Sequence, residues 1–133
     1  MNYVDSVEGI TSAQLQGFFV GWPNPPQPEQ HLTLLQQSSH IVIAQTDDGQ
    51  VVGFVTAISD GVVAAHIPLL EVLPDFQRQG VGSQLVKRIL ANLHAYYSVD
   101  LVCDSPLGSF YERLGFARYL GMVIRRPFGM ESS

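Results

Sequence analysis

Residues 70–83 read LEVLPDFQRQGVGS, and the pattern of apolar and polar residues changes twice along them. An apolar run ends at Pro74, a polar loop follows, and Gly80 and Gly82 lead into a pattern of helical periodicity. Such a loop places consecutive backbone N–H groups at the start of a helix, where unpaired donors and the helix dipole favour an anion such as a pyrophosphate. The glycine spacing fits neither the dinucleotide-binding fingerprint nor a Walker loop, which disfavours a plain nucleotide-phosphate binder or hydrolase.

The residues after this loop predict two helices, a strand and a closing segment. Apolar residues recur on one helical face over residues 80–95, and a buried strand is expected at residues 99–103. A short helix is expected from Ser105, its cap, to a left-handed stop at Gly115. Residues 116–126 are expected to add one or two strands.

The residues before the loop predict an antiparallel meander. Its three strands are expected in runs of β-branched and aromatic residues, at residues 41–44, 51–58 and 62–73. Asp-Gly pairs at positions 48–49 and 60–61 favour tight turns between them. Pro68 lies inside the third run, where it cannot donate a ladder hydrogen bond, so we expect a bulge or a splayed strand near it.

Two short helices are expected nearer the N-terminus. Thr11 and Gln14 have the spacing of a capping box, which predicts a helix over residues 11–20. Pro28 suits a first helical position, and residues 29–37 then predict a second helix. The whole order predicts a mixed α/β sheet in one domain, residues 1–133.

Charge is distributed unevenly along the chain. Only 14% of residues are charged and the net charge is -5, which argues against a protein held by the nucleic-acid backbone. Residues 1–77 carry eight carboxylates and no Lys or Arg, whereas residues 78–133 carry seven Lys and Arg and four carboxylates. This asymmetry, -8 against +3, indicates two partners, one cationic and one anionic.

The compartment is predicted from what the chain contains. A single cysteine, Cys103, excludes an intramolecular disulfide and fits a reducing compartment. The first residues do not have the pattern of a signal peptide, and the longest uncharged stretch, residues 9–28, is interrupted by four prolines. We therefore expect a cytoplasmic protein that does not contact a membrane.

Two motifs in this order resemble a known family. Gln77-x-x-Gly80-x-Gly82 is similar to the Gln/Arg-x-x-Gly-x-Gly/Ala signature of the GNAT superfamily of acyl-CoA N-acyltransferases. Residues 110–116, FYERLGF, are similar to the family's Phe-Tyr-x-x-Leu-Gly-Phe box. The element order also matches over nearly the whole chain if Tyr3–Asp5 forms a first strand. The resemblance implies a GNAT-like, mostly antiparallel sheet of six to seven strands with about four helices, splayed between strands 4 and 5.

The resemblance also implies a site for the cofactor, acetyl-CoA, in a V-shaped opening between the strands that end at Val72 and Cys103. Pantetheine would pair with strand backbone, as an added strand does at a sheet edge, at Leu70, Glu71 and Val72. Pyrophosphate would bind backbone amides of the loop, at Arg78, Gln79, Gly80, Val81, Gly82 and Ser83. Asp104 replaces an asparagine that contacts cofactor in many members, so it is expected either to do the same or to cap the next helix. No metal is expected.

The implied reaction is N-acetylation, in which a primary amine attacks the thioester directly. Such a reaction needs a base for the amine, a donor for the developing oxyanion and a proton for the leaving thiolate. By position, Tyr111 resembles the family's general acid and would lie near the CoA sulfur; the alternative is a packed tyrosine with a structural hydrogen bond. The backbone N–H of Val72 is the simplest oxyanion donor. Cys103 is expected to be a small core residue and not a nucleophile.

The base has two candidates on the strand before the loop. Glu71 is the only charged residue in an apolar run, and burial would raise its pKa, which suits a base. His66 is the other candidate, because a histidine needs no change in pKa to act as a base near neutrality. Strand parity puts the two on opposite faces, but a bulge at Pro68 would change that parity. Proton loss through ordered water is a third alternative.

The acceptor site is implied to lie at the first two helices and their connection, where Phe19, Trp22 and Glu29 are candidate substrate-binding residues. Aromatic rings hold apolar or cationic groups, although Phe19 also fits a core position. The acidic first half favours a cationic amine, of a small molecule or a protein. The alternative function is a non-catalytic acyl-CoA-binding sensor or regulatory module, and the closing segment makes a homodimer a further hypothesis.

Overall fold

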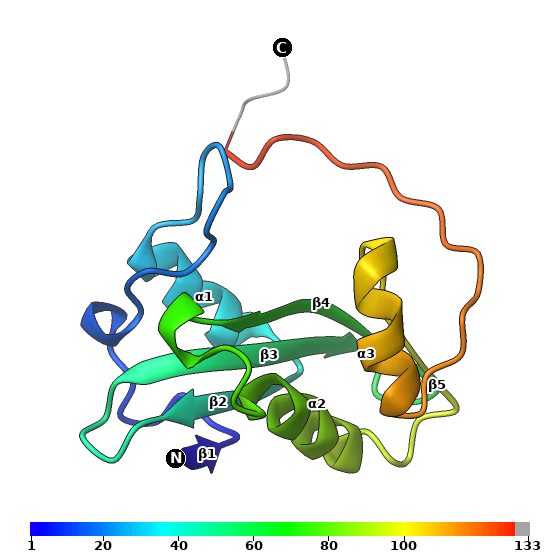
Figure 1. The fold of residues 1–133 in the computed structure, drawn as a ribbon, viewed down its shortest axis with the longest axis horizontal. Helices are drawn as coiled ribbons and strands as arrows, with labels where there is room; N and C mark the ends of the chain where they lie inside the picture. Colours follow the sequence, from blue (N-terminus) through cyan, green and yellow to red (C-terminus); the bar gives the residue numbers. More distant parts are fainter. Residues whose placement is uncertain (130–133) are drawn as a thin grey trace.

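The computed structural model describes residues 1–129. Its strands are β1 Asn2–Val4, β2 His40–Gln45, β3 Val51–Ser59, β4 Ala64–Val72 and β5 Ser98–Asp100. Its helices are α1 Pro28–Gln37, α2 Val81–Asn92 and α3 Gly108–Arg113, with 3-10 turns η1 Ser12–Gln14, η2 Pro74–Phe76 and η3 Ser105–Leu107. The strands form one sheet in the order β1-β2-β3-β4-β5, in which only β4 and β5 are parallel (Figure 1).

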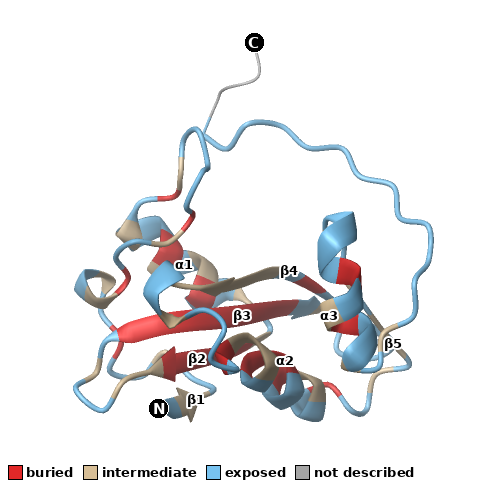
Figure 2. Ribbon diagram, in the orientation of Figure 1, coloured by how far each residue is buried: buried red, intermediate tan, exposed pale blue. Residues whose placement is uncertain are grey.

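The sheet separates two apolar layers. On one face α2 packs Leu85 and Ile89 against Val55, and on the other face α1 and the residues before it pack Leu35 against Phe54. Because β3 lies between both layers, it is buried on both faces from residue 51 to residue 57 (Figure 2). The core therefore holds the central strands rigidly and leaves the ends of β4 and the loop after it at the surface.

The predicted meander is confirmed as β2, β3 and β4. Gly49 and Gly61 adopt φ of 88° and 79°, which is the left-handed region that their turns require. The Asp60 carboxylate accepts the backbone N–H groups of residues 62–64 and closes the second turn.

The expected bulge at Pro68 is also present. Thr56 pairs with Leu69 and Ile58 pairs with His66, so two residues of β4 stand opposite one residue of β3. Side chains at 65, 67, 70 and 72 then face α2, and those at 66, 69 and 71 face α1. The extra residue therefore puts His66 and Glu71 on the same face of the sheet.

The first predicted helix, residues 11–20, is wrong. The Thr11 and Gln14 capping box exists, but it opens only the 3-10 turn η1. Gly17 and Phe19 take φ of 85° and 63°, and a left-handed residue cannot continue a right-handed helix. The second expected helix is confirmed as α1, with Pro28 at its first position.

The C-terminal half departs from expectation in four places. α2 ends at Asn92, and β5 is a short, partly exposed strand. Asp104, not Ser105, precedes the next turn, and its side chain makes no capping hydrogen bond. Residues 116–129 contain no strand, because nothing within the described chain pairs with them. The described fold thus has five strands and three α-helices, fewer than the six to seven strands and about four helices expected.

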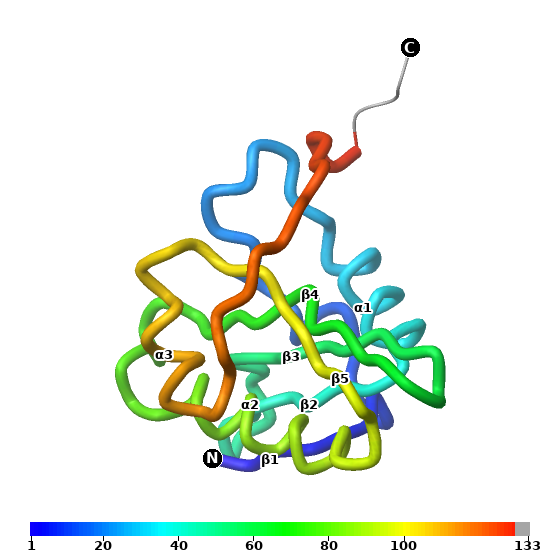
Figure 3. Tube along the Cα trace, turned by 90° about the vertical axis from the view of Figure 1, so that its right-hand side faces the viewer, coloured from blue at the N-terminus to red at the C-terminus, as the bar shows by residue number. Residues whose placement is uncertain are grey.

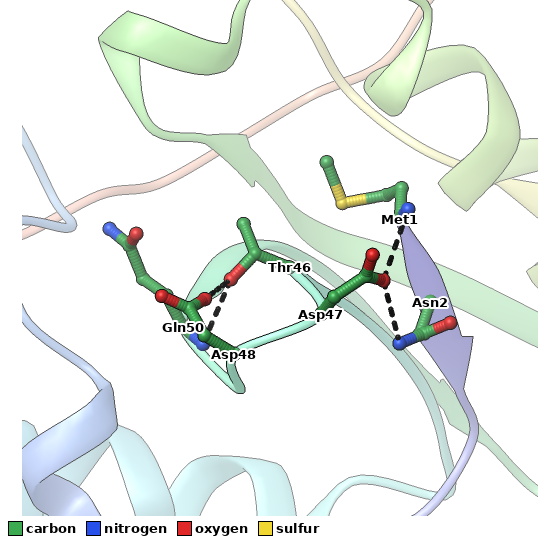
Figure 4. A network of polar contacts seen from close by, with 6 residues as sticks. All are labelled: Met1, Asn2, Thr46, Asp47, Asp48 and Gln50. Carbon is green, nitrogen blue, oxygen red and sulfur yellow. Dashed lines mark hydrogen bonds and ion pairs between the residues drawn. The ribbon is translucent and has the colours of Figure 1, made fainter.

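The N-terminal strand is tied to the turn between β2 and β3 (Figure 4). The Asp47 carboxylate lies 3.9 Å from the amino group of Met1 and accepts the Asn2 amide at 3.4 Å. In the same turn the Thr46 hydroxyl contacts Asp48 and accepts the backbone N–H of Gln50. These contacts hold β1 at the sheet edge opposite β5.

We predict that Gly53→Ala destabilises the protein by about 1–3 kcal/mol, because β3 lies too close to its neighbours there for a larger residue. A Cβ at position 53 would stand 3.1 Å from both the carbonyl oxygen of Glu71 and a methyl of Leu85. Gly82→Ala is the matched control: its Cβ would lie 3.7 Å from Phe110, and alanine favours helix by about 1 kcal/mol. Urea unfolding followed by circular dichroism measures both, and equal stabilities of the two variants would contradict the prediction.

Candidate functional site

The two strands β4 and β5 part after a short paired region. Their parallel pairing runs only from Ala64 to His66 on β4, so residues 67–72 have no strand beside them on that edge. The backbone N–H of Leu73 donates to Val52 on β3, at 2.8 Å. Since backbone groups alternate along a strand, those of Leu70 and Val72 point to the open edge and those of Glu71 point to β3. The edge offers the N–H groups of both residues and the carbonyl of Leu70, as a peptide-like arm requires, while the carbonyl of Val72 accepts the Gln77 side chain.

The loop that follows ends beside this edge. Arg78 and Gly80 adopt left-handed φ of 63° and 84° and turn the chain into α2. Within residues 1–129 the backbone N–H groups of 78–83 have no hydrogen-bond partner, so they remain available to an anion. The Gln77 side chain donates to the carbonyl of Val72 at 2.9 Å and fixes the loop to the end of β4.

Glu71 points from β4 towards the connection between η1 and α1. Its Oε1 accepts the backbone N–H of Phe19 at 2.9 Å, while Oε2 is buried without a partner among the described residues. Burial raises the pKa of the Glu71 carboxyl, and the hydrogen bond from Phe19 partly opposes this shift. A carboxylate with a raised pKa and one unused oxygen is suited to accept a proton.

Tyr111 lies on α3 and is buried, with its ring 4.9 Å from that of Phe110 and 5.7 Å from that of Phe116. Burial, and secondarily the neighbouring thiol of Cys103, raises the pKa of its hydroxyl. Tyr111 therefore keeps its proton at neutral pH. It borders a cavity of about 1130 Å³ together with Cys103 and His66.

His66 lies where β4 and β5 are still paired. Its Nδ1 is 2.6 Å from the Asp100 carboxylate, and both side chains are largely exposed. At about 3.3 Å per residue, Glu71 lies roughly 15 Å further along β4. Although the bulge puts the two on one face, they cannot serve the same reacting atom.

The candidate acceptor residues differ in exposure. Phe19 is only 3% exposed and belongs to the core, and its backbone N–H donates to Glu71. Trp22 is 41% exposed, with its ring 5.0 Å from that of Phe19. Glu29 is exposed in the first turn of α1. The structure thus brings Phe19, Trp22 and Glu71 together, whereas Asp104 is exposed before η3.

The sequence analysis missed His31. It is 1% exposed on α1, neither ring nitrogen has a partner among the described residues, and its ring lies 4.4 Å from that of Phe54. Burial lowers the pKa of His31 to about 4. The available signal was its position four residues before Leu35, on the same helical face.

Comparisons with known proteins agree with one another. The family model described as an acetyltransferase (GNAT) domain matches residues 37–118. A solved structure from Deinococcus radiodurans R1, named "putative acetyltransferase", is 50% identical with a TM-score of 0.92, covering 94% of this chain and 87% of that chain.

Sequence relatives point to the same activity. The uncharacterized N-acetyltransferase ycf52 of Pyropia yezoensis is 29% identical over 122 residues, covering 87% of this chain and 70% of its own. The GCN5-related N-acetyltransferase 1, chloroplastic, of Arabidopsis thaliana is 30% identical, covering 89% of this chain and 59% of its own. Among residues 1–129, no helix is both long and apolar enough to cross a membrane.

We predict that His31 makes folding less favourable as the pH falls from 6.5 towards 4. Below pH 6.5 the imidazole takes up a proton in the unfolded chain but not in the folded one. The free energy of unfolding therefore falls as the pH falls, by at most about 3 kcal/mol. His31→Phe should retain the aromatic contacts and lose this dependence.

Urea unfolding of both proteins across that pH range checks the prediction. The raised pKa of Glu71 acts with the opposite sign in both proteins, so the difference between them isolates His31. Parallel stability curves would show that His31 is not the cause.

Proposed function

This chain belongs to the GNAT family of acetyltransferases, and we propose that it transfers the acetyl group of acetyl-CoA to a primary amine by direct attack on the thioester. The observation that carries the proposal is the unpaired edge of β4 at residues 67–72, which leads directly into a loop of unpartnered N–H groups. One strand edge for an amide-bearing arm and one helix start for a diphosphate are what acyl-CoA requires.

The residues present fit acetyl-CoA, which supplies the activated acetyl group. Leu70 directs its backbone groups to the open edge, where they would hold the pantetheine arm, and Val72 directs its N–H there, where the thioester would lie. The N–H groups of residues 78–83 would hold the pyrophosphate. Gly82 has no side chain to occupy the space between this loop and Phe110. The basic half of the sequence begins at this loop, which matches the negative charge of the cofactor.

Glu71 is the proposed general base. An alkyl amine has a pKa near ~10, so its proton must be removed at neutral pH. Phe19 holds Oε1 of Glu71 and leaves Oε2 free to take that proton, directly or through one water. His66 is paired with Asp100 at the closed end of the two strands, away from the open edge.

Tyr111 is the proposed general acid, and Val72 supplies the oxyanion donor. The raised pKa of Tyr111 keeps its hydroxyl protonated until a stronger base, the departing thiolate, is present. The outward-pointing N–H of Val72 would stabilise charge on the thioester oxygen.

The proposed acceptor is a cationic amine, of a small molecule or a protein. The residues around Glu71 come from the part of the chain that carries eight carboxylates and no Lys or Arg. Partly exposed Trp22 offers an aromatic face and exposed Glu29 offers a charge at the rim. A reducing compartment such as the cytoplasm fits the free Cys103, although the Arabidopsis relative is named as chloroplastic.

We predict that Glu71→Gln lowers kcat/KM for the best amine by roughly a hundredfold or more. The amide oxygen still accepts the Phe19 N–H, so the fold is retained while the proton acceptor is lost. The acidic limb of the pH profile, which reports the raised pKa of Glu71, should disappear with it. Thiol release from acetyl-CoA across a panel of cationic, neutral and acidic amines gives the measurement.

His66→Gln is the matched control and should change turnover little. The opposite result, loss with His66→Gln and none with Glu71→Gln, would assign the base to His66, and no loss with either would favour proton transfer through water. If acetyl-CoA raises the melting temperature while no amine releases thiol, the chain acts as a non-catalytic acyl-CoA-binding module.

We predict that Tyr111→Phe lowers kcat by roughly a hundredfold with little change in the Kd of acetyl-CoA, because only the proton of the hydroxyl is removed. The ring contacts with Phe110 and Phe116 survive in the variant. Calorimetric titration gives the Kd and thiol release gives kcat. Equal turnover of both proteins would leave Tyr111 a packing residue.

A further inference from the structure

The segment after α3, residues 116–129, runs outside the body of the protein as a long arc (Figure 1). Its large apolar side chains are almost fully exposed: Tyr119 92%, Leu120 91%, Met122 88% and Ile124 83%. An apolar run of this kind in water marks a surface that another molecule covers. Within residues 116–129 its ends are held: the Phe116 N–H and the Arg118 side chain donate to Tyr111 and Glu112 of α3, and the Asn24 amide donates to the carbonyl of Phe128 at 2.9 Å.

An opening separates this tail from β5. The cavity of about 1130 Å³ is lined on one side by residues 97–103 and on the other by residues 114–122. The tail rises past β5 in the same general direction (Figures 1 and 3). The edge of β5 that faces the cavity carries no strand in the described chain, since β5 pairs only with β4. Two extended segments that flank an opening, each with an unpaired edge, form the walls of a place for one more strand.

We propose that the missing strand is the tail of a second copy of this chain. A strand between two parallel segments pairs with both if it runs antiparallel to them. A two-fold axis between the two tails makes them antiparallel, so each copy gives one strand and receives one. The resulting continuous sheet has the order β4, β5, partner's tail, own tail, partner's β5, partner's β4.

Charge supports a second copy as the occupant. Residues 98–112 carry Asp100, Asp104 and Glu112 and no Lys or Arg, whereas residues 117–128 carry Arg118, Arg125 and Arg126 and no carboxylate. Between these two segments, among residues 1–129, Arg118 and Glu112 form the one ion pair, at 3.1 Å, and Asp100 lies 2.6 Å from His66. The acidic wall of one copy therefore matches the basic tail of the other.

Exchange would also give both backbone edges of the tail a hydrogen-bonding partner. An unrelated peptide would fill the opening but would leave the outer edge of the tail bare. With a second copy, one edge of each tail pairs with the other tail and the opposite edge pairs with the partner's β5. The exchanged strand would also occupy part of the cavity that Tyr111 borders, although the dimer does not depend on the reaction proposed for that residue.

Sedimentation and light scattering of the full chain over a wide range of concentration test the proposal. We expect a mass twice that of the 14.6 kDa chain. Leu120→Glu should give the monomer, because a carboxylate would be buried in the exchanged strand. Val62→Glu, at a 75% exposed site in the turn before β4, should remain dimeric. A monomer at every concentration, or a dimer that both variants retain, overturns the proposal.

Cross-linking supplies a second readout that does not depend on destabilising the dimer. Single cysteines are placed at each position from 118 to 124 in a Cys103→Ser background and oxidised. Around a two-fold axis only residues close to that axis meet their own copies, so disulfide-linked dimers should be confined to one or two neighbouring positions. Cross-linking at no position, or equally at all of them, contradicts an antiparallel exchange.

Discussion

The structure depends on the early end of the pairing between β4 and β5. One extra residue at Pro68 bends β4, and the two strands remain hydrogen-bonded only as far as His66 and Asp100. Beyond that point β4 has a neighbouring strand on the β3 side alone. The same bend reverses which side chains face which layer, so it both opens the edge and directs Glu71 towards α1 rather than α2. The bulge at Pro68 thus accounts both for the open edge of β4 and for the orientation of Glu71 beside that edge.

The contact between Phe19 and Glu71 joins the two halves of the site. Phe19 is held at a φ of 63°, a conformation that costs a non-glycine residue energy, and its N–H donates to a half-buried carboxylate. The packing of Phe19 against Trp22 and His31 keeps this strained residue in place. The connection that would form the acceptor side is therefore fixed to the strand that would bind the cofactor. Gly17 and Phe19, whose left-handed conformations no local pattern revealed, also prevent the 3-10 turn that the capping box opens from continuing as a helix.

Local signals predicted the elements that depend on local chemistry. The Asp-Gly turns, the proline at the start of α1, the bulge at Pro68 and the loop before α2 follow from backbone preferences, and all were predicted from sequence. Features that depend on tertiary packing were not. His31 is polar by type but buried by its helical phase, and residues 116–126 have strand-forming side chains but no strand to pair with in the described chain. Strand propensity reports a fit to a sheet, and that fit exists only when a neighbouring strand is present.

The shortness of β5 affects what can bind along both of its edges. Three residues of parallel pairing to β4 are all that the sheet contributes to its position. On one side β5 parts from β4 at the open edge proposed for acetyl-CoA, and residues 97–103 also line the cavity beneath the tail, which His66 and Tyr111 border as well. A strand added to its outer edge would supply backbone hydrogen bonds along residues beyond Asp100 as well, where β4 has already turned away. The far wall of the proposed acetyl-CoA site would then be held by the partner's tail more than by the chain's own sheet, which links the open edge, the exposed apolar tail and the two oppositely charged segments in one arrangement.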